Sequence, residues 1–218
     1  VQGVIAGGLP ALTRAMEGAE DHPEDGAAEM DRLNVNENDF VLGIAASGTT
    51  PFVHGALRRA VERGARTGFL LCTYPAPELY ERHDVVIAPL VGPEVVTGST
   101  RMKAGTATKL VLNTISTATM IRLGKVFGNL MVDLRATNLK LQDRSERILM
   151  EMCDLDRPEA RRLLDSAGGS VKLAIAMYWT GADADEARRR LQESEGRLGE
   201  LRQRQLAAGP NGRREEGA

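Results

Sequence analysis

The chain has 218 residues, enough for one α/β domain with a small second module. Its 28 Lys and Arg nearly cancel its 30 Asp and Glu, and this balance argues against a nucleic-acid partner or an anionic membrane surface. The cysteines form no CxxC pair, the histidines have no metal-ligand spacing, and no apolar run could cross a bilayer. We therefore expect a cytoplasmic protein without a metal.

The first half of the chain alternates apolar runs with helical stretches. In chain order, the sequence predicts strands at 1–6, 40–46, 67–73 and 85–88, with helices at 10–16, 24–33 and 51–63. This alternation is typical of a doubly wound parallel sheet, a Rossmann-like three-layer sandwich. Such sheets bind ligands at the edge where the loops follow the strands.

The second half of the chain is helical. Helices are predicted at 101–123 and 138–152, followed by three short ones that begin near 156, 171 and 183. We therefore expect an α/β domain at 1–135, a small module of three short helices at 140–192 and a disordered polar tail at 193–218. Because residues 1–6 already form a strand pattern, an N-terminal part of a longer protein is expected to be missing.

The loop after the second predicted strand has the chemistry of an anion site. Ser47, Thr49 and Thr50 offer hydroxyl donors, Gly48 lets a ligand approach the backbone, and the following helix begins with free amides. A simpler interpretation is that Thr50 only caps the helix before Pro51. The loop lacks the Walker lysine and the spaced glycines of a nucleotide site.

A second loop of this kind follows the strand at 85–88. Ser99 and Thr100 supply donors, while Arg101 and Lys103 would lie in the first turn of a helix, where their charge opposes the helix dipole. An anion must compensate for this placement. Either a bound ligand or the internal carboxylate of Glu94 fits that role. Two such loops on one sheet favour a single phosphorylated ligand.

An acidic loop follows the first predicted strand. Glu17 and Glu20 lie there, at the expected ligand edge. A carboxyl group near a sugar can act as general acid or base. The alternative is a solvated acidic turn with no chemical role.

At these residues the chain resembles the N-acetylmuramic acid 6-phosphate etherases and their relative, glucokinase regulatory protein. The similarity runs from Val1 to about Leu191. It is carried by the signature at 92–109 and by matching segments at 5–8, 17–21, 43–48 and 125–133.

The resemblance implies a sugar isomerase-type phosphosugar-binding domain, a ubiquitin-associated-like helical module and a homodimer. It further implies a cofactor-free lyase that cleaves the D-lactyl ether of N-acetylmuramic acid 6-phosphate, giving N-acetylglucosamine 6-phosphate and D-lactate. The family uses two glutamates as acid and base. Glu20 matches one of them, while the other, together with the first phosphate loop, lies upstream of Val1. The fragment itself is then expected to be inactive.

Two departures and two alternatives accompany this resemblance. Family members often carry Arg where this chain has Thr49, and the turn at 72–75 differs from the usual asparagine-containing one. A non-catalytic phosphosugar-binding regulator would share the same loops, although the regulatory relative carries two such domains. An aldose–ketose phosphate isomerase normally lacks the 92–109 segment.

Overall fold

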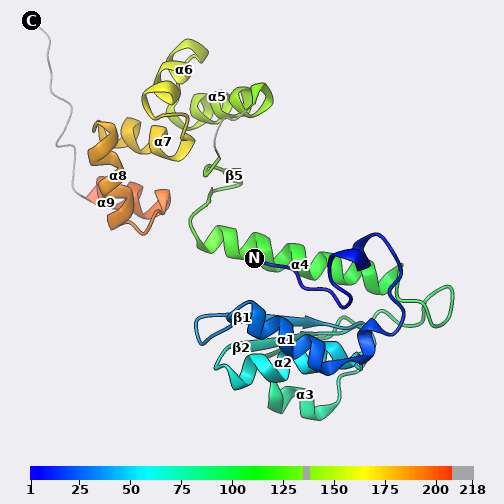
Figure 1. Cartoon of the computed structure of the whole chain (residues 1–218). Helices are drawn as coiled ribbons and strands as arrows, with labels where there is room; N and C mark the ends of the chain where they lie inside the picture. The colour runs from blue at the N-terminus through cyan, green and yellow to red at the C-terminus, as the bar shows by residue number, and fades with distance from the viewer. Residues whose placement is uncertain (135–137, 208–218) are drawn as a thin grey trace, which may run out of the picture. The chain divides into compact units, whose positions relative to one another are not determined.

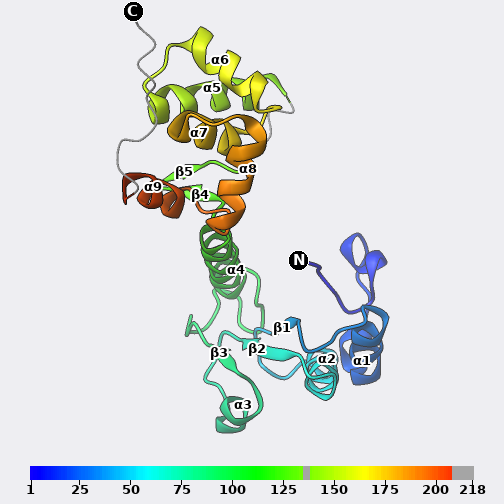
Figure 2. The ribbon, with the colours of Figure 1, turned by 90° about the vertical axis from the view of Figure 1, so that its left-hand side faces the viewer.

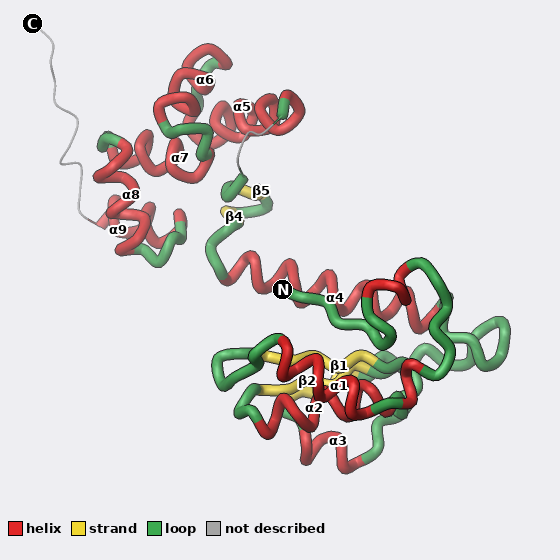
Figure 3. The backbone as a smooth tube through the Cα atoms, in the orientation of Figure 1, coloured by secondary structure: helices red, strands yellow, loops and turns green. Residues whose placement is uncertain are grey.

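The first half of the chain forms a parallel sheet covered by helices. The computed structural model describes residues 1–134 and 138–207, and its first compact unit is Val1–Asn113. In chain order, this unit contains η1 (Leu9–Leu12), η2 (Ala19–Asp21), α1 (Pro23–Arg32), β1 (Phe40–Ile44), α2 (Pro51–Glu62), β2 (Arg66–Leu70), α3 (Pro77–Arg82), β3 (Val85–Ile87) and the start of α4 (Lys103–Arg122). The strands are parallel in the order β1-β2-β3, which confirms the predicted α/β class (Figures 1 and 3).

The middle strand of the sheet forms its most buried part. Phe69 and Leu70 of β2 are fully buried, as expected for a strand with a neighbour on each side. Strand β1 is different, because it pairs only with β2 and leaves Phe40 and Ile44 exposed. One edge of the sheet is therefore open at β1.

The segment 1–6 does not form the predicted strand. It carries no regular secondary structure and pairs with no strand that the structure describes. An isolated apolar run has no ladder of hydrogen bonds to satisfy its backbone, so its β pattern alone does not make a strand. The helix predicted at 10–16 is likewise shorter, a 3-10 turn at Leu9–Leu12.

Helix α1 packs along α2, and α2 packs on β1 and β2 (Figure 1). Two glycines allow the two helices to approach closely. A Cβ on Gly26 would lie 2.0 Å from the carbonyl oxygen of Phe52, and a Cβ on Gly55 would lie 1.9 Å from that of Pro23. Because a methyl group at either position would meet backbone, this contact fixes α1 against the start of α2.

The second unit, Thr114–Ala218, is built from helices and one short hairpin. Its start lies within α4, so the unit boundary falls earlier than the expected division near 135. Strands β4 (Val126–Phe127) and β5 (Leu130–Met131) form the hairpin, and the helices are α5 (Leu139–Cys153), α6 (Arg157–Ser166), α7 (Val171–Thr180), α8 (Ala184–Glu193) and α9 (Leu198–Ala207).

Helix α7 is the centre of this second unit. It contacts α5, α6, α8 and α9, as the helices gathered around it in Figure 2 show. It is apolar on nearly all sides, with Val171, Ala174 and Ile175 fully buried. Such a helix is stable in water only when neighbours cover it. The helix starts are also well capped, for example by Asp156, which forms a capping box at α6.

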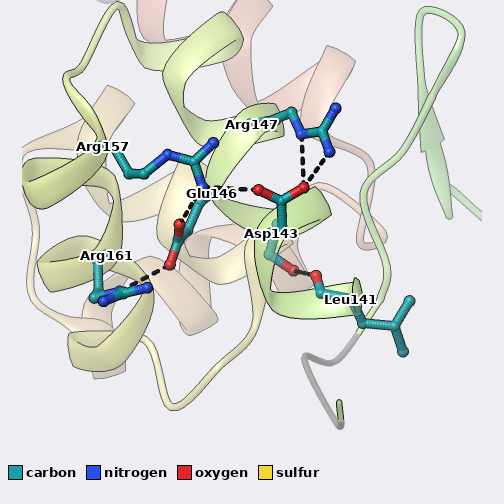
Figure 4. A network of polar contacts seen from close by, with 7 residues as sticks. Leu141, Asp143, Glu146, Arg147, Arg157 and Arg161 are labelled. Atoms are coloured by element: carbon teal, nitrogen blue, oxygen red, sulfur yellow. Dashed lines mark hydrogen bonds and ion pairs between the residues drawn. The ribbon is translucent and has the colours of Figure 1, made fainter. Parts of the chain in front are cut away.

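One buried carboxylate ties α5 to α6. Glu146 is only 1% exposed, and its oxygens accept hydrogen bonds from Arg157 and Arg161, each at 2.8 Å (Figure 4). Arg157 also donates to Asp143, which bonds Arg147 in turn. The buried charge is thus paired on both oxygens, as such a group requires.

The prediction of a disordered polar tail at 193–218 is wrong for residues 198–207. Residues Leu198–Ala207 form α9, and Leu198 and Leu201 are buried in the core around α7. These two leucines lie three residues apart on one helix face, enough to anchor an otherwise polar helix. The disorder expected beyond 207 lies outside the described residues. Among the helices of 1–134 and 138–207, none is both long and apolar enough to span a bilayer.

Candidate functional site

The loop between β1 and α2 forms a compact turn at the carboxyl end of the strand. Gly48 has a φ of 80°, a left-handed conformation that favours glycine, and its N–H donates to the carbonyl of Ala45. The Ser47 hydroxyl lies 2.9 Å from that of Thr49 and accepts a hydrogen bond from the Thr49 N–H. The turn therefore presents two exposed, mutually bonded hydroxyl groups.

Thr50 does not cap α2 with its side chain. It occupies the N-cap position, but its hydroxyl forms no capping hydrogen bond. Instead its carbonyl accepts from the N–H groups of Val53 and His54. The simpler interpretation of this loop, a side-chain helix cap, is therefore not what the structure contains, and the Thr50 hydroxyl is left for another partner.

The second loop resolves the question of the anion at the start of α4. The carboxylate of Glu94 accepts hydrogen bonds from the backbone N–H groups of Lys103, at 3.0 and 3.1 Å, and Ala104, at 3.1 Å. These N–H groups hold the pKa of Glu94 below its usual value. The anion at the start of α4 is thus the internal carboxylate of Glu94, one of the two that the sequence left open. Lys103 also uses its Nζ internally, on the Pro93 carbonyl at 2.9 Å.

The remaining residues of the second loop form fewer side-chain hydrogen bonds. Ser99 is half-buried, while Thr100 and Arg101 are exposed. The guanidinium of Arg101 forms no hydrogen bond or ion pair with any residue in the described part of the chain. The guanidinium of Arg101 is therefore available to a bound anion.

Glu20 lies on the short turn η2, directly after Gly18, which adopts a left-handed conformation. This turn contacts α2, the helix that follows the Ser47 loop. The Glu20 side chain is exposed and bonds no residue that the structure describes. Its carboxylate is available to a ligand.

One pocket brings several of these residues together. Glu20, Ser47, Thr50 and Thr100 all line a pocket of about 860 Å³ in the first unit. This volume includes the space along the open edge of β1, which apolar residues line. The pocket combines a free carboxylate with three hydroxyl groups. Five of the predicted residues do not line it, namely Gly48, Thr49, Ser99, Arg101 and Lys103.

The open edge of β1 forms one wall of the same pocket. The N–H of Ala45 and the carbonyl of Asp39 bond to β2 and its flank. Because backbone groups alternate sides along a strand, those of Phe40, Leu42 and Ile44 face away from β2. An edge with unpaired N–H and C=O groups is a template for another strand. The sequence pattern did not reveal this edge, since it depends on which strands are neighbours.

Comparison with known proteins gives two findings that agree. The family described as glucokinase regulatory protein N-terminal SIS domain matches residues 1–61, which include Glu20 and the Ser47 loop. The N-acetylmuramic acid 6-phosphate etherase of Synechococcus elongatus is 51% identical over 198 residues. The etherases of Crocosphaera subtropica and Gloeobacter violaceus are each 50% identical over 198 residues.

The chain is a homologue of these etherases. The matched part covers 91% of this chain and 64–65% of the relatives, so the chain spans a little under two thirds of their length. The match to the SIS family covers residues 1–61, which include α1, β1 and most of α2 in the first unit. The etherase homology therefore extends through both units of the structure.

His54 is a residue beside the site that the sequence pattern did not single out. Its Nε2 lies 2.8 Å from the carbonyl oxygen of Gly48. Side chains on a helix lean toward its N-terminus, so a residue four positions after Thr50 lies over the loop. That spacing was the signal available in the sequence.

Proposed function

We propose that this chain forms the larger part of an etherase that acts on N-acetylmuramic acid 6-phosphate. The pocket with Glu20, Ser47, Thr50 and Thr100 is the observation that carries the proposal. Hydroxyl donors at the start of a helix suit a phosphate, and a free carboxylate beside them suits proton transfer. The names of the homologues add the substrate class.

The proposed reaction is a carbon–oxygen lyase reaction followed by hydration. The lactyl ether bond breaks as a proton leaves the sugar, and D-lactate departs. Water then adds to the double bond, which gives N-acetylglucosamine 6-phosphate. Glu20 serves as one of the two acid–base groups, and no cofactor takes part. A second glutamate, expected upstream of Val1, serves as the other.

The two loops bind the phosphosugar in this proposal. Ser47, Gly48, Thr49 and Thr50 hold the phosphate. Ser99, Thr100, Arg101 and Lys103 complete the ligand edge, and Arg101 is a cation that bonds none of the described residues. Lys103 reaches a ligand only when its Nζ leaves the Pro93 carbonyl.

The open edge of β1 supports a longer functional protein. A strand that precedes Val1 would pair with the N–H and C=O groups of Phe40, Leu42 and Ile44 and fill the part of the pocket along β1. The first phosphate loop would then lie beside the part that Glu20, Ser47 and Thr50 line, which is left to the ligand. The α/β unit then holds the substrate, and the helical unit around α7, with α9 included, is a separate addition. We expect the 218-residue chain alone to be inactive.

The enzyme serves amino-sugar catabolism and cell-wall recycling in the cytoplasm. It acts as a homodimer in this proposal. Exposed apolar residues along α4, among them Leu112, Ile115 and Ile121, offer a surface for the second subunit. Light scattering on the full-length protein tests this part. A monomeric mass at micromolar concentration would contradict the dimer.

Release of D-lactate tests the proposed function. The full-length gene product is incubated with N-acetylmuramic acid 6-phosphate, and D-lactate is measured with D-lactate dehydrogenase. We expect D-lactate and N-acetylglucosamine 6-phosphate in equal amounts. Binding without lactate would instead support a phosphosugar-binding regulator. Interconversion of sugar phosphates on chromatography would support an isomerase.

A further inference from the structure

His54 connects the core of the first unit to the Ser47 loop. It lies in the second turn of α2, and its half-buried ring stacks on Phe69 with ring centroids 5.3 Å apart. Its Nε2 lies 2.8 Å from the carbonyl oxygen of Gly48. A carbonyl oxygen only accepts hydrogen bonds, so Nε2 carries the hydrogen and donates it.

This hydrogen bond fixes the direction of one peptide group in the loop. The C=O of Gly48 and the N–H of Thr49 belong to the same planar trans peptide and point in opposite directions. Because His54 holds the C=O toward α2, the N–H of Thr49 points the other way, to the side of the Ser47 hydroxyl. The orientation of the donors in the loop thus depends on His54.

The loop needs this orientation because it contains no cation. Between Ser47 and Thr50 there are only hydroxyl groups and backbone N–H groups. Neutral donors hold a phosphate well when they are aligned before the ligand arrives, since binding then costs less ordering. Glycine at 48, with its left-handed φ, is the position in this loop where the backbone most needs such a restraint.

We propose that His54 is a positioning residue of this loop, which acts by holding the Gly48–Thr49 peptide so that the Thr49 N–H fixes the hydroxyl of Ser47, a residue of the pocket, for a sugar phosphate. This inference rests on the proposed function. It adds a residue that lies behind the loop, on the side of the core, and that reaches the ligand only through the backbone.

A second histidine provides a matched control. His83 stacks on the same Phe69 ring, with centroids 5.7 Å apart, and its Nδ1 lies 3.0 Å from the hydroxyl oxygen of Thr67. It therefore has a similar stack and a similar hydrogen bond, but it does not touch the loop. Loss of a stacked histidine can be separated in this way from loss of the loop contact.

The test measures binding of N-acetylglucosamine 6-phosphate to the full-length protein by isothermal titration calorimetry. His54→Phe keeps the stack and removes the donor, so we expect about fivefold weaker binding, the value of one hydrogen bond. His54→Gln places an amide N–H at the same number of bonds from Cα, and we expect it to restore binding to within about twofold. His83→Phe should bind as the wild type does.

Wild-type affinity in His54→Phe would overturn the inference, as would equal losses in His54→Phe and His83→Phe. If His54→Phe does not fold, the ring 15N signals of the wild type decide. Titration with N-acetylglucosamine 6-phosphate should then shift the Nε2 signal of His54 and leave that of His83 in place, and an unmoved His54 signal would contradict the proposal. No binding to the wild type would overturn the proposed function and this inference together.

Discussion

The two units of the chain differ in how far they satisfy their own polar groups and cover their own apolar surface. In the helical unit, one continuous core surrounds α7, and the buried carboxylate of Glu146 is paired with two arginines. The hydroxyl of Ser194 is the one buried side-chain polar atom without a partner among the described residues.

The α/β unit has no such buried atom among its described residues, but its core and its sheet are less complete. Its core is divided into two smaller clusters, β1 has an open edge, and a pocket of about 860 Å³ lies beside it. Glu20 and Arg101 have no partner in the described part of the chain. The open sheet edge and the pocket thus lie together in the α/β unit, where a ligand and further chain are expected.

The largest expected effect is on the rate of D-lactate release when the carboxylate of Glu20 is removed. Glu20→Gln in the full-length protein should lower the rate of D-lactate release about a hundredfold or more, because an acid–base group is removed. Binding of N-acetylglucosamine 6-phosphate should persist. Glu17→Gln is the control, since Glu17 lies in the same loop but does not line the pocket. Equal rates in Glu20→Gln and the wild type would remove Glu20 from the mechanism.

The next effect tests the closest helix contact in the α/β unit. Gly55→Ala places a methyl group 1.9 Å from the carbonyl oxygen of Pro23, so α1 must move away from α2. We expect the free energy of unfolding to fall by about 2–3 kcal/mol in urea denaturation. Gly199→Ala in α9 meets nothing within 4 Å and should be neutral or slightly stabilising. Equal stability of Gly55→Ala and the wild type would show that the two helices are not in close contact.

The corresponding test in the helical unit removes the buried charge. Glu146→Gln replaces two charge-assisted hydrogen bonds with weaker ones, and we expect a loss of about 2 kcal/mol in the unfolding of this unit. Glu151→Gln on the same helix is the control, because its side chain is exposed. Urea denaturation followed by the fluorescence of Trp179 measures the effect. Equal urea midpoints in Glu146→Gln and Glu151→Gln would show that the buried charge of Glu146 does not stabilise the helical unit.

The smallest expected effect is on the loss of folding stability at acid pH. The pKa of Glu94 lies below its usual value, because backbone N–H groups at the start of α4 bond its charged form. Its contribution to stability is thus complete above the ordinary glutamate pKa of about 4.3 and is lost as the pH falls through the lower pKa of the folded state.

Glu94→Gln should therefore lose less thermal stability than the wild type when the pH falls from about 6 to about 3, as measured by circular dichroism. Glu81→Gln removes the same charge from an exposed position and should follow the wild type. Identical curves for Glu94→Gln and the wild type would show that this carboxylate does not hold the helix start.

The sequence predicted the parts of the fold that depend on local patterns. The apolar run at 40–46 and Pro51 after it defined β1 and α2, and the capping pattern at Asp156 defined the start of α6. Segment 1–6 did not follow its pattern, because a strand requires a neighbour. Helix α9 was missed because only Leu198 and Leu201 anchor it, too few for a periodic signal.

The candidate site was predictable to a similar extent. Loop chemistry identified Glu20, Ser47 and Thr50, which the structure brings to one pocket. Whether the anion at the start of α4 was Glu94 or a ligand could not be decided, since both satisfy the same N–H groups. The contact of His54 is signalled by its place four residues after Thr50 on α2, and the composition of the loop alone does not contain it.

Binding of a sugar phosphate tests the central claim most directly, namely that the pocket beside the open sheet edge holds the phosphosugar. The full-length protein is titrated with N-acetylglucosamine 6-phosphate and with N-acetylglucosamine by calorimetry. We predict binding that requires the phosphate and that is lost in the double variant Ser47→Ala, Thr50→Val. Equal binding of both sugars, or unchanged binding by the double variant, would contradict the account.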